Sequence, residues 1–230
     1  MNSDATAPRD AADMEDIRRA LRGDAAVVLP NPPPLTHVVT ATRPHTVNEA
    51  KARPAAQPVA LWAHHPATLR TVTACTGLDP AGTALAGRLL AEEHLTLLLP
   101  LRTDTRLPAW LPPACKDGWV LLFGARWHPL VPLLDDHPVL YVSSANRTGH
   151  QPATTPAEAL AMFPASVPVL HLPHPGDDPA DSATRRATTT VALHPDGNLA
   201  LHRTGAQDQP YPHPDDYLAH LRTQYTPSFT

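Results

Sequence analysis

Two short segments of this sequence carry side chains that could bind a phosphate chain. Lys51 and Arg53 stand two residues apart just before Pro54, and Ser144 and Asn146 stand two apart directly after an apolar run. A residue before proline favours extended backbone, and positions i and i+2 of an extended chain share one face. Each pair is therefore predicted to point one way. Two cations facing a hydroxyl and an amide are suited to hold a polyphosphate.

Short apolar strands must place these residues. The run 138–142 predicts a buried strand that delivers Ser144 at its tip, and 58–62 predicts another just after Arg53. Further strands are expected at 25–29, 38–39, 95–99, 120–123 and 167–172, with an Asp-Gly hairpin joining 189–193 to 199–203. Helices are expected at 13–21, 46–50, 66–75, 80–93, 128–135, 155–162 and 214–225, and a mobile loop at 177–187.

Composition limits the class of protein. The 230 residues carry a net charge of -4 with a mean hydropathy of -0.24, which argues against direct nucleic-acid binding, since that affinity comes from phosphate neutralisation. The longest apolar run, 95–101, is too short to cross a membrane. The polar N-terminus lacks the pattern of a secretory signal. We therefore predict a cytoplasmic protein with no membrane partner.

The cysteines and histidines do not show the spacing of a metal site, so none is predicted. Cys75 and Cys115 are far apart and fit reduced thiols. The 14 histidines lack the supporting spacing of a zinc site. The chain is predicted to divide into a flexible N-terminal arm at 1–12, a domain at 13–206, and a C-terminal tail with one short helix at 207–230.

Several motifs occur in a diagnostic order. They are Lys51-Ala52-Arg53-Pro54, Pro58-Val59-Ala60-Leu61, Leu95-Thr96-Leu97-Leu98-Leu99, His128-Pro129-Leu130, Ser144 with Asn146 and Gly149, Thr189-Thr190, and Arg203 with Gly205 and Ala206. This order resembles the YrdC-like family, whose best-known members are threonylcarbamoyl-AMP synthases. The resemblance covers roughly residues 13–206.

The resemblance implies a fold and an activity. The fold is α/β, a twisted open mixed sheet with helices around a large basic nucleotide-binding concavity. The activity is formation of a carbamoyl-adenylate from an amine or amino acid, bicarbonate and ATP, with Mg²⁺ expected alongside ATP. The resemblance places catalysis at Lys51, Arg53, Ser144 and Asn146, and nucleotide binding at these four together with Gln57, Thr96, Thr189, Thr190 and Arg203.

The sequence also departs from the family. Where members carry Pro-Thr-x-Thr-x-Tyr-Gly, this chain has 32–38, which lacks that pattern. Gly124 stands where members have an arginine, for which Arg126 is a candidate replacement, and Trp62 stands where many have a histidine. In the family these positions mostly line the amino-acid pocket. We therefore predict a substrate pocket lined by Trp62, Gly124 and Val142 that takes an altered amine.

Three functions stay open at this point. The first is the carbamoyl-adenylate synthase. The second is transfer of a carbamoyl group, from a carbamoyl donor, onto a small molecule in specialised metabolism. The third is a catalytically silent module that binds a nucleotide or RNA in the same concavity, which the lost motif favours and the acidic balance opposes.

Overall fold

The structure is a computed structural model that describes residues 10–173 and 182–225. It contains a nine-stranded open sheet in the order β1-β2-β7-β3-β6-β4-β8-β9, with β5 paired to β6. The pairs β3/β6 and β4/β8 are parallel and the others are antiparallel, which confirms the predicted mixed α/β sheet. The strands are β1 Val27–Leu29, β2 Val38–Ala41, β3 Ala60–Trp62, β4 Thr96–Pro100, β5 Cys115–Lys116, β6 Trp119–Phe123, β7 Tyr141–Ser144, β8 Thr190–Leu193 and β9 Leu199–Arg203.

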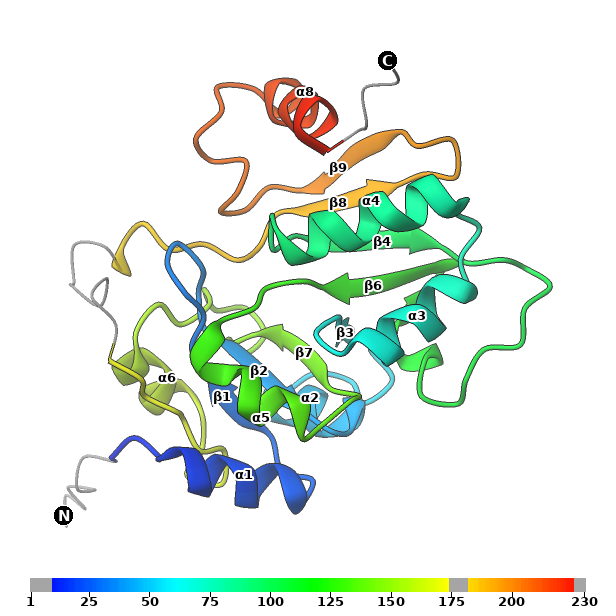
Figure 1. The fold of residues 1–230 in the computed structure, drawn as a ribbon. Helices are drawn as coiled ribbons and strands as arrows, with labels where there is room; N and C mark the ends of the chain where they lie inside the picture. The colour runs from blue at the N-terminus through cyan, green and yellow to red at the C-terminus, as the bar shows by residue number, and fades with distance from the viewer. Residues whose placement is uncertain (1–9, 174–181, 226–230) are drawn as a thin grey trace, which may run out of the picture.

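Helices lie around this sheet (Figure 1). The α-helices are α1 Met14–Arg22, α2 Pro44–Ala50, α3 Pro66–Ala74, α4 Pro80–Ala91, α5 Val131–Asp135, α6 Pro156–Met162 and α8 Pro214–Tyr225, and two short 3-10 turns are η1 Pro112–Ala114 and η2 His128–Leu130. Proline opens most of them, because its fixed φ suits the first helical turn and its missing N–H costs nothing there. No helix in the described ranges is both long enough and apolar enough to cross a membrane.

The two faces of the sheet form two separate apolar cores. Side chains alternate between faces along a strand, so Leu61 and Leu122 join one core while Trp62 and Phe123 join the other. The first core is covered by α2, α3 and α4. The second is covered by α1 and α5. Helices α1 and α5 cover only part of the second face of the sheet. The remaining part of that face can therefore line a site.

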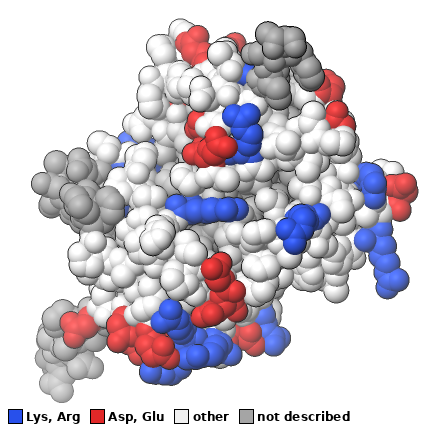
Figure 2. Space-filling view, viewed as in Figure 1, with Lys and Arg blue, Asp and Glu red and all other residues white. Residues whose placement is uncertain are grey.

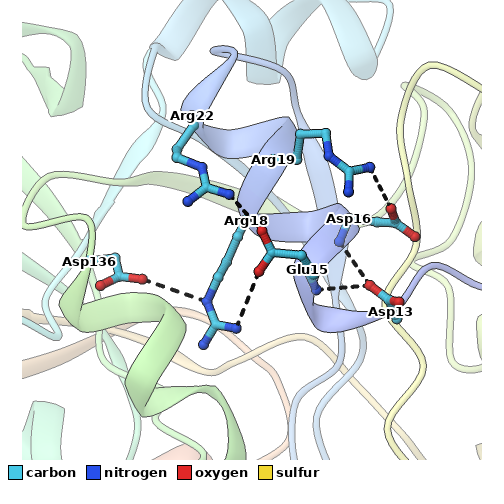
Figure 3. A network of polar contacts seen from close by, with 7 residues as sticks. All are labelled: Asp13, Glu15, Asp16, Arg18, Arg19, Arg22 and Asp136. Atoms are coloured by element: carbon cyan, nitrogen blue, oxygen red, sulfur yellow. Dashed lines mark hydrogen bonds and ion pairs between the residues drawn. The ribbon is translucent and has the colours of Figure 1, made fainter.

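Charged residues of both signs gather on α1, at the lower end of the view in Figure 2. The Asp13 carboxylate caps the helix by accepting the backbone N–H groups of Glu15 and Asp16 at 2.8 and 2.9 Å. Arg18 reaches from α1 to Asp136 at the end of α5, with Nε 3.7 Å from Oδ2 (Figure 3). These ion pairs are solvated, and each contributes about 1 kcal/mol or less to the stability of the fold. They help to hold α1 in place and do not form a site.

Most predicted elements form within a few residues of their expected bounds. The run 167–172 forms only isolated bridges, Val169 with Val28 and Leu170 with Ala12, rather than a strand of the sheet. The two-residue strand β5 was not predicted. Part of the predicted loop at 177–187 and most of the predicted N-terminal arm lie outside the described residues.

The C-terminal helix α8 packs into the first core. Tyr217, Leu218, Leu221 and Tyr225 are buried there. The Arg88 guanidinium of α4 donates to the Tyr225 carbonyl at 3.0 Å. The segment after residue 206 is therefore part of the packed structure as far as Tyr225.

Candidate functional site

Lys51 lies at the end of helix α2, in a turn rather than an extended segment. Its backbone is helical, with φ -88° and ψ 0°, and the next residue, Ala52, is left-handed at φ 52°. The expected extended geometry is therefore wrong. The reason is that the proline rule restricts only the residue directly before it, here Arg53. Lys51 therefore keeps the helical backbone conformation of the end of α2.

Lys51 nevertheless reaches the predicted partner segment at the end of β7. Its ammonium group donates to the Ser144 carbonyl and to Asn146 Oδ1, the latter at 2.8 Å. In return, the Thr148 amide donates to the Lys51 carbonyl at 3.1 Å. Both the side chain and the backbone of Lys51 thus fix the loop that follows β7. The structure brings the two segments together although about ninety residues separate them.

Ser144 and Asn146 point toward each other, as their spacing predicts. The Ser144 hydroxyl donates to Asn146 Oδ1 at 2.6 Å, and Asn146 Nδ2 donates to the His150 carbonyl at 2.8 Å. Because the amide oxygen accepts two donors, Lys51 and Ser144, the orientation of the Asn146 amide is determined. The tip of β7 is therefore preorganised.

Arg53 presents one end of its guanidinium to a cavity. Its Nε donates to Asn48 Oδ1, while Nη2 is buried without a hydrogen-bond partner. Asn48 is fully buried and its Nδ2 donates to the carbonyls of Ala55 and Gln57, both at 2.8 Å. Asn48, which sequence reasoning missed, holds the turn that carries Arg53. Arg53 thus lines a cavity and has a buried donor, Nη2, that the protein itself leaves unsatisfied, which is uncommon for a buried polar group.

Two neighbouring cavities lie on the uncovered part of the second face. The first has a volume of about 450 Å³ and the second about 840 Å³. Thr36, Ser144, Ala187 and Arg203 line both, so the cavities meet at these residues. Among the described residues, the cationic side chains of the walls are Arg53, Lys116, Arg185, Arg186 and Arg203, and the one carboxylate is that of Asp208. The concavity is basic.

Threonine and arginine side chains from β4, β8 and β9 form one wall of the first cavity. Thr96 pairs with Thr190, and Thr190 pairs with Arg203, so all three lie level across the sheet. The hydroxyl groups of Thr96 and Thr188 are hydrogen-bonded at 2.6 Å, and Arg203 Nη2 donates to the Thr188 carbonyl at 3.1 Å. Thr188 was not predicted, although it directly precedes the predicted pair.

Five predicted residues line neither cavity, and the first is Lys51, whose ammonium group is bonded to the Ser144 carbonyl and to Asn146 Oδ1. Thr189 is fully buried and its hydroxyl donates to Asp208 Oδ1 at 2.5 Å, because it points to the opposite side of the strand from Thr190. Gln57 is exposed outside both cavities. Trp62 is fully buried, and its indole Nε1 donates to the Ala125 carbonyl at 2.8 Å. The fifth is Gly124. Val142 does line the first cavity.

Gly124 is required by packing against α4. A Cβ atom there would lie 2.5 Å from the Leu90 carbonyl oxygen and 2.7 Å from the Leu95 carbonyl oxygen. The prediction that it lines a substrate pocket is not supported. Arg126 also lies outside the two cavities, and its Nη2 donates to the Ala63 carbonyl at 2.8 Å.

We predict that Gly124→Ala lowers the free energy of unfolding by about 3 kcal/mol, because only backbone atoms surround the new methyl group and backbone yields poorly. Gly87→Ala is the matched control. Its Cβ, inside helix α4, would meet nothing within 4 Å. The free energy of unfolding of this variant should therefore rise by about 0.5–1 kcal/mol. Urea unfolding of the two variants measures both values. Equal effects would contradict the packing argument.

The electrostatics of the site favour an anionic ligand. Burial, followed by the nearby charges of Arg53 and Arg203, lowers the pKa of Lys51 from its ordinary value to about 7. Burial also lowers the pKa of the Arg53 and Arg203 guanidinium groups. Three cations thus share a partly desolvated volume in which their charged forms are penalised. A bound polyanion would relieve that penalty.

The described residues do not provide a magnesium cage. They contain no group of three or more histidine, cysteine or carboxylate side chains that could hold a metal ion. One oxygen of the Asp208 carboxylate, Oδ1, accepts hydrogen bonds from the Thr189 hydroxyl and from the Gly205 amide, the latter at 2.6 Å.

Comparison with solved structures shows the class of fold. Sua5 from P. abyssi in complex with L-threonine has a TM-score of 0.61 and 18% identity, over 86% of this chain and 56% of that one. HypF in its phosphate- and nucleotide-bound form has a TM-score of 0.61 and 14% identity, over 88% of this chain and 30% of that one. E. coli YciO has a TM-score of 0.60 and 13% identity, over 83% and 87%.

The chain thus spans little more than half of Sua5 and less than a third of HypF. No curated protein matches it. Its residues 38–205 match the Sua5/YciO/YrdC family, described as telomere recombination. The chain belongs to this family.

Proposed function

We propose that the protein binds ATP across the border of the two cavities and uses it to convert an amine and bicarbonate into a carbamoyl-adenylate. The observation that carries this proposal is the meeting of Lys51 with the tip of β7 at Ser144, a residue that lines both cavities, with Arg53 on the wall of the first. Family membership supports the type of reaction. A cytoplasmic location, where ATP and bicarbonate are available, is part of the proposal.

The different linings of the two cavities favour the body of the nucleotide in the second and the body of the amine in the first, with the phosphates at their border. The second cavity is lined largely by polar side chains, among them Gln151, Thr154, Arg186 and Gln209, which suit a nucleotide. The first has a sheet floor of apolar side chains, which suits the body of an amine. The reacting groups would meet at the shared residues Ser144 and Arg203.

The proposed chemistry has two steps. The amine attacks bicarbonate, and loss of water leaves a carbamate. A carbamate oxygen then bonds to the α-phosphorus of ATP, the bond from that phosphorus to the bridging oxygen breaks, and pyrophosphate leaves. No protein nucleophile is needed, because phosphoryl-type transfer depends mainly on positioning and on charge stabilisation. Lys51, Arg53 and Arg203 would supply that charge, and Ser144 and Asn146 would orient the reacting oxygens.

An altered amine substrate is favoured over threonine by the walls of the first cavity. Leu35 and Thr36 line it from the segment where the family pattern of threonines is lost. Apolar residues Phe123 and Val142 lie on its floor. A substrate hydroxyl lying over this floor would meet apolar side chains, which is costly, and would find partners only at the threonine wall of the cavity.

ATP–pyrophosphate exchange in the presence of bicarbonate and a panel of amines tests the proposal. We expect exchange with at least one amine and reduced exchange in Arg203→Ala and Ser144→Ala, each with ATP affinity lower by about 10-fold because a charged-group hydrogen bond is lost. Arg19→Ala, an exposed arginine on α1, is the matched control. ATP binding without exchange for any amine would favour the non-catalytic module instead.

A further inference from the structure

A β-bulge in strand β9 turns a histidine toward the first cavity. Thr190 pairs with Arg203 while the next residue, Val191, pairs with Leu201, so His202 is an extra residue on β9. In a regular strand neighbouring side chains point to opposite faces, and a bulge interrupts this alternation. Both His202 and Arg203 line the first cavity. The bulge therefore brings a histidine and an arginine to the same wall.

The imidazole ring of His202 is available to a ligand. Within the described part of the chain its ring nitrogen atoms form no hydrogen bond and no ion pair, and the residue is exposed. The buried ring of His64, by contrast, is bonded to three backbone carbonyl groups. A histidine without protein partners on a cavity wall can exchange a proton with a molecule bound there.

The other charged groups around His202 cannot take up a proton in its place. Arg53, Lys116 and Arg203 share the wall of the first cavity, and arginine and lysine ordinarily carry their proton already at neutral pH. The described lining of this cavity includes no carboxylate, and strand β8 carries no charged side chain. Arg222 of α8 donates to the Leu199 carbonyl at 3.2 Å, at the opposite end of β9. Among the described residues of this lining, only His202 is of a type that accepts a proton near neutral pH.

The first step of the proposed reaction needs a proton acceptor. An ordinary amine is an ammonium ion at neutral pH, and an ammonium nitrogen has no electron pair with which to attack bicarbonate. The nitrogen loses two protons as the carbamate forms. One leaves with the hydroxyl group of bicarbonate as water, and the other must be taken up by a base. A positioned general base accelerates such a step by about 100-fold to 10,000-fold.

We propose that His202 is the general base that takes this proton from the amine. The inference rests on the proposed function, in which the amine lies in the first cavity and the reacting groups meet at Arg203, the residue after His202. The ammonium nitrogen passes one proton to the imidazole ring, and its freed electron pair forms the bond to the carbon of bicarbonate. Because His202 is exposed, the imidazolium ion then returns its proton to solvent.

The test compares His202→Gln with the parent protein, because glutamine keeps a polar side chain but takes up no proton. The initial rate of pyrophosphate release, with saturating ATP, bicarbonate and the best amine of the panel, should fall by about 100-fold at pH 7. The affinity for a non-hydrolysable ATP analogue should not change. His171→Gln, at an exposed histidine outside both cavities, is the matched control and should release pyrophosphate at the parent rate.

The pH profile distinguishes a general base from a structural residue. Without His202 the amine must lose its proton to water, so the rate of the variant should rise by about 10-fold per pH unit. The ratio of the parent rate to the variant rate should therefore fall from about 100 at pH 7 toward about 1 at pH 9. Both proteins contain Lys51, so its titration affects both rates alike.

Two kinds of failure are distinguishable. A ratio that is the same at every pH, or a variant as active as the parent, would overturn the role of His202 and leave the proposed function standing. If the parent protein releases no pyrophosphate with any amine, the proposed function fails and the role of His202 fails with it.

Discussion

Replacing Lys51 by methionine is expected to reduce ATP–pyrophosphate exchange by about 100-fold to 1000-fold, the usual cost of removing one preorganised donor from a site of developing charge. The ammonium group of Lys51 joins the end of α2 to the Ser144 carbonyl and Asn146 Oδ1. Methionine has a similar length but donates nothing. The measurement is the exchange rate at saturating ATP with the best amine of the panel.

Lys51→Arg is the informative partner of this variant. Arginine keeps the positive charge but cannot place a compact ammonium group at a site where Lys51 is only 3% exposed. We expect Lys51→Arg to bind ATP more tightly than Lys51→Met and still to exchange poorly. Near-normal exchange in Lys51→Met would show that this lysine is structural.

The lowered pKa of Lys51 makes ATP binding depend on pH. In the free protein the group is charged below pH 7 and increasingly neutral above it. Because ATP phosphates favour the ammonium form, the pKa rises in the complex and ATP binding takes up a proton above pH 7. ATP affinity should therefore fall as pH rises from 7 to 9, by up to about 10-fold per pH unit. Lys51→Arg, which stays charged, should not show this fall.

Arg53→Ala is expected to weaken ATP binding by about 100-fold, because a partly desolvated, charge-assisted contact is lost. Arg53 Nε is already bonded to Asn48 Oδ1 and Arg53 lines the first cavity, so its two terminal nitrogen atoms are the donors left for a phosphate. Arg53→Lys should restore little of the affinity, since a lysine cannot bond Asn48 and a phosphate with the same geometry. Calorimetric titration with ATP measures both variants.

Asn48→Ala provides the control for positioning. Asn48 touches the turn at Ala55 and Gln57 and lines neither cavity. We expect it to weaken ATP binding less than Arg53→Ala does, and to lower the unfolding free energy as well by removing the two hydrogen bonds to the Ala55 and Gln57 carbonyls. Identical ATP affinities of Arg53→Ala and the parent protein would contradict the assignment of Arg53.

The sequence predicted the sheet class and the contact between the segment at Lys51 and the tip of β7, for which we propose phosphate binding. It predicted less well on which face of the sheet each side chain lies. Thr189 and Thr190 are neighbours in sequence, and since strand side chains alternate, only Thr190 lines the cavity while Thr189 bonds Asp208. Residue type alone does not distinguish the two.

Local sequence patterns did not indicate where in the sheet a strand lies or which helices cover it. Trp62 shares a face with Ala60, but it lies against Phe123 with ring centroids 5.4 Å apart, inside the core that α1 and α5 cover. Strand alternation indicates the face of a residue and not whether a helix covers it. The pocket assignment of Trp62 failed for that reason.

Arg185 and Arg186 were missed because their placement depends on a distant segment. The Arg186 amide donates to the Pro34 carbonyl at 2.9 Å, and the Thr36 amide donates to the Arg186 carbonyl at 3.0 Å. No local signal predicts a pairing between residues about 150 positions apart. Lys116, by contrast, directly precedes Asp117-Gly118, a hairpin signal that would have revealed β5.

A crystal structure with a non-hydrolysable ATP analogue tests the central claim most directly. We expect the α-phosphate to lie at the border of the two cavities, within hydrogen-bonding distance of Lys51 Nζ or the Ser144 hydroxyl, with Arg53 Nη2 on a phosphate oxygen. A nucleotide bound elsewhere on the protein, with Arg53 Nη2 still unpaired, would contradict it.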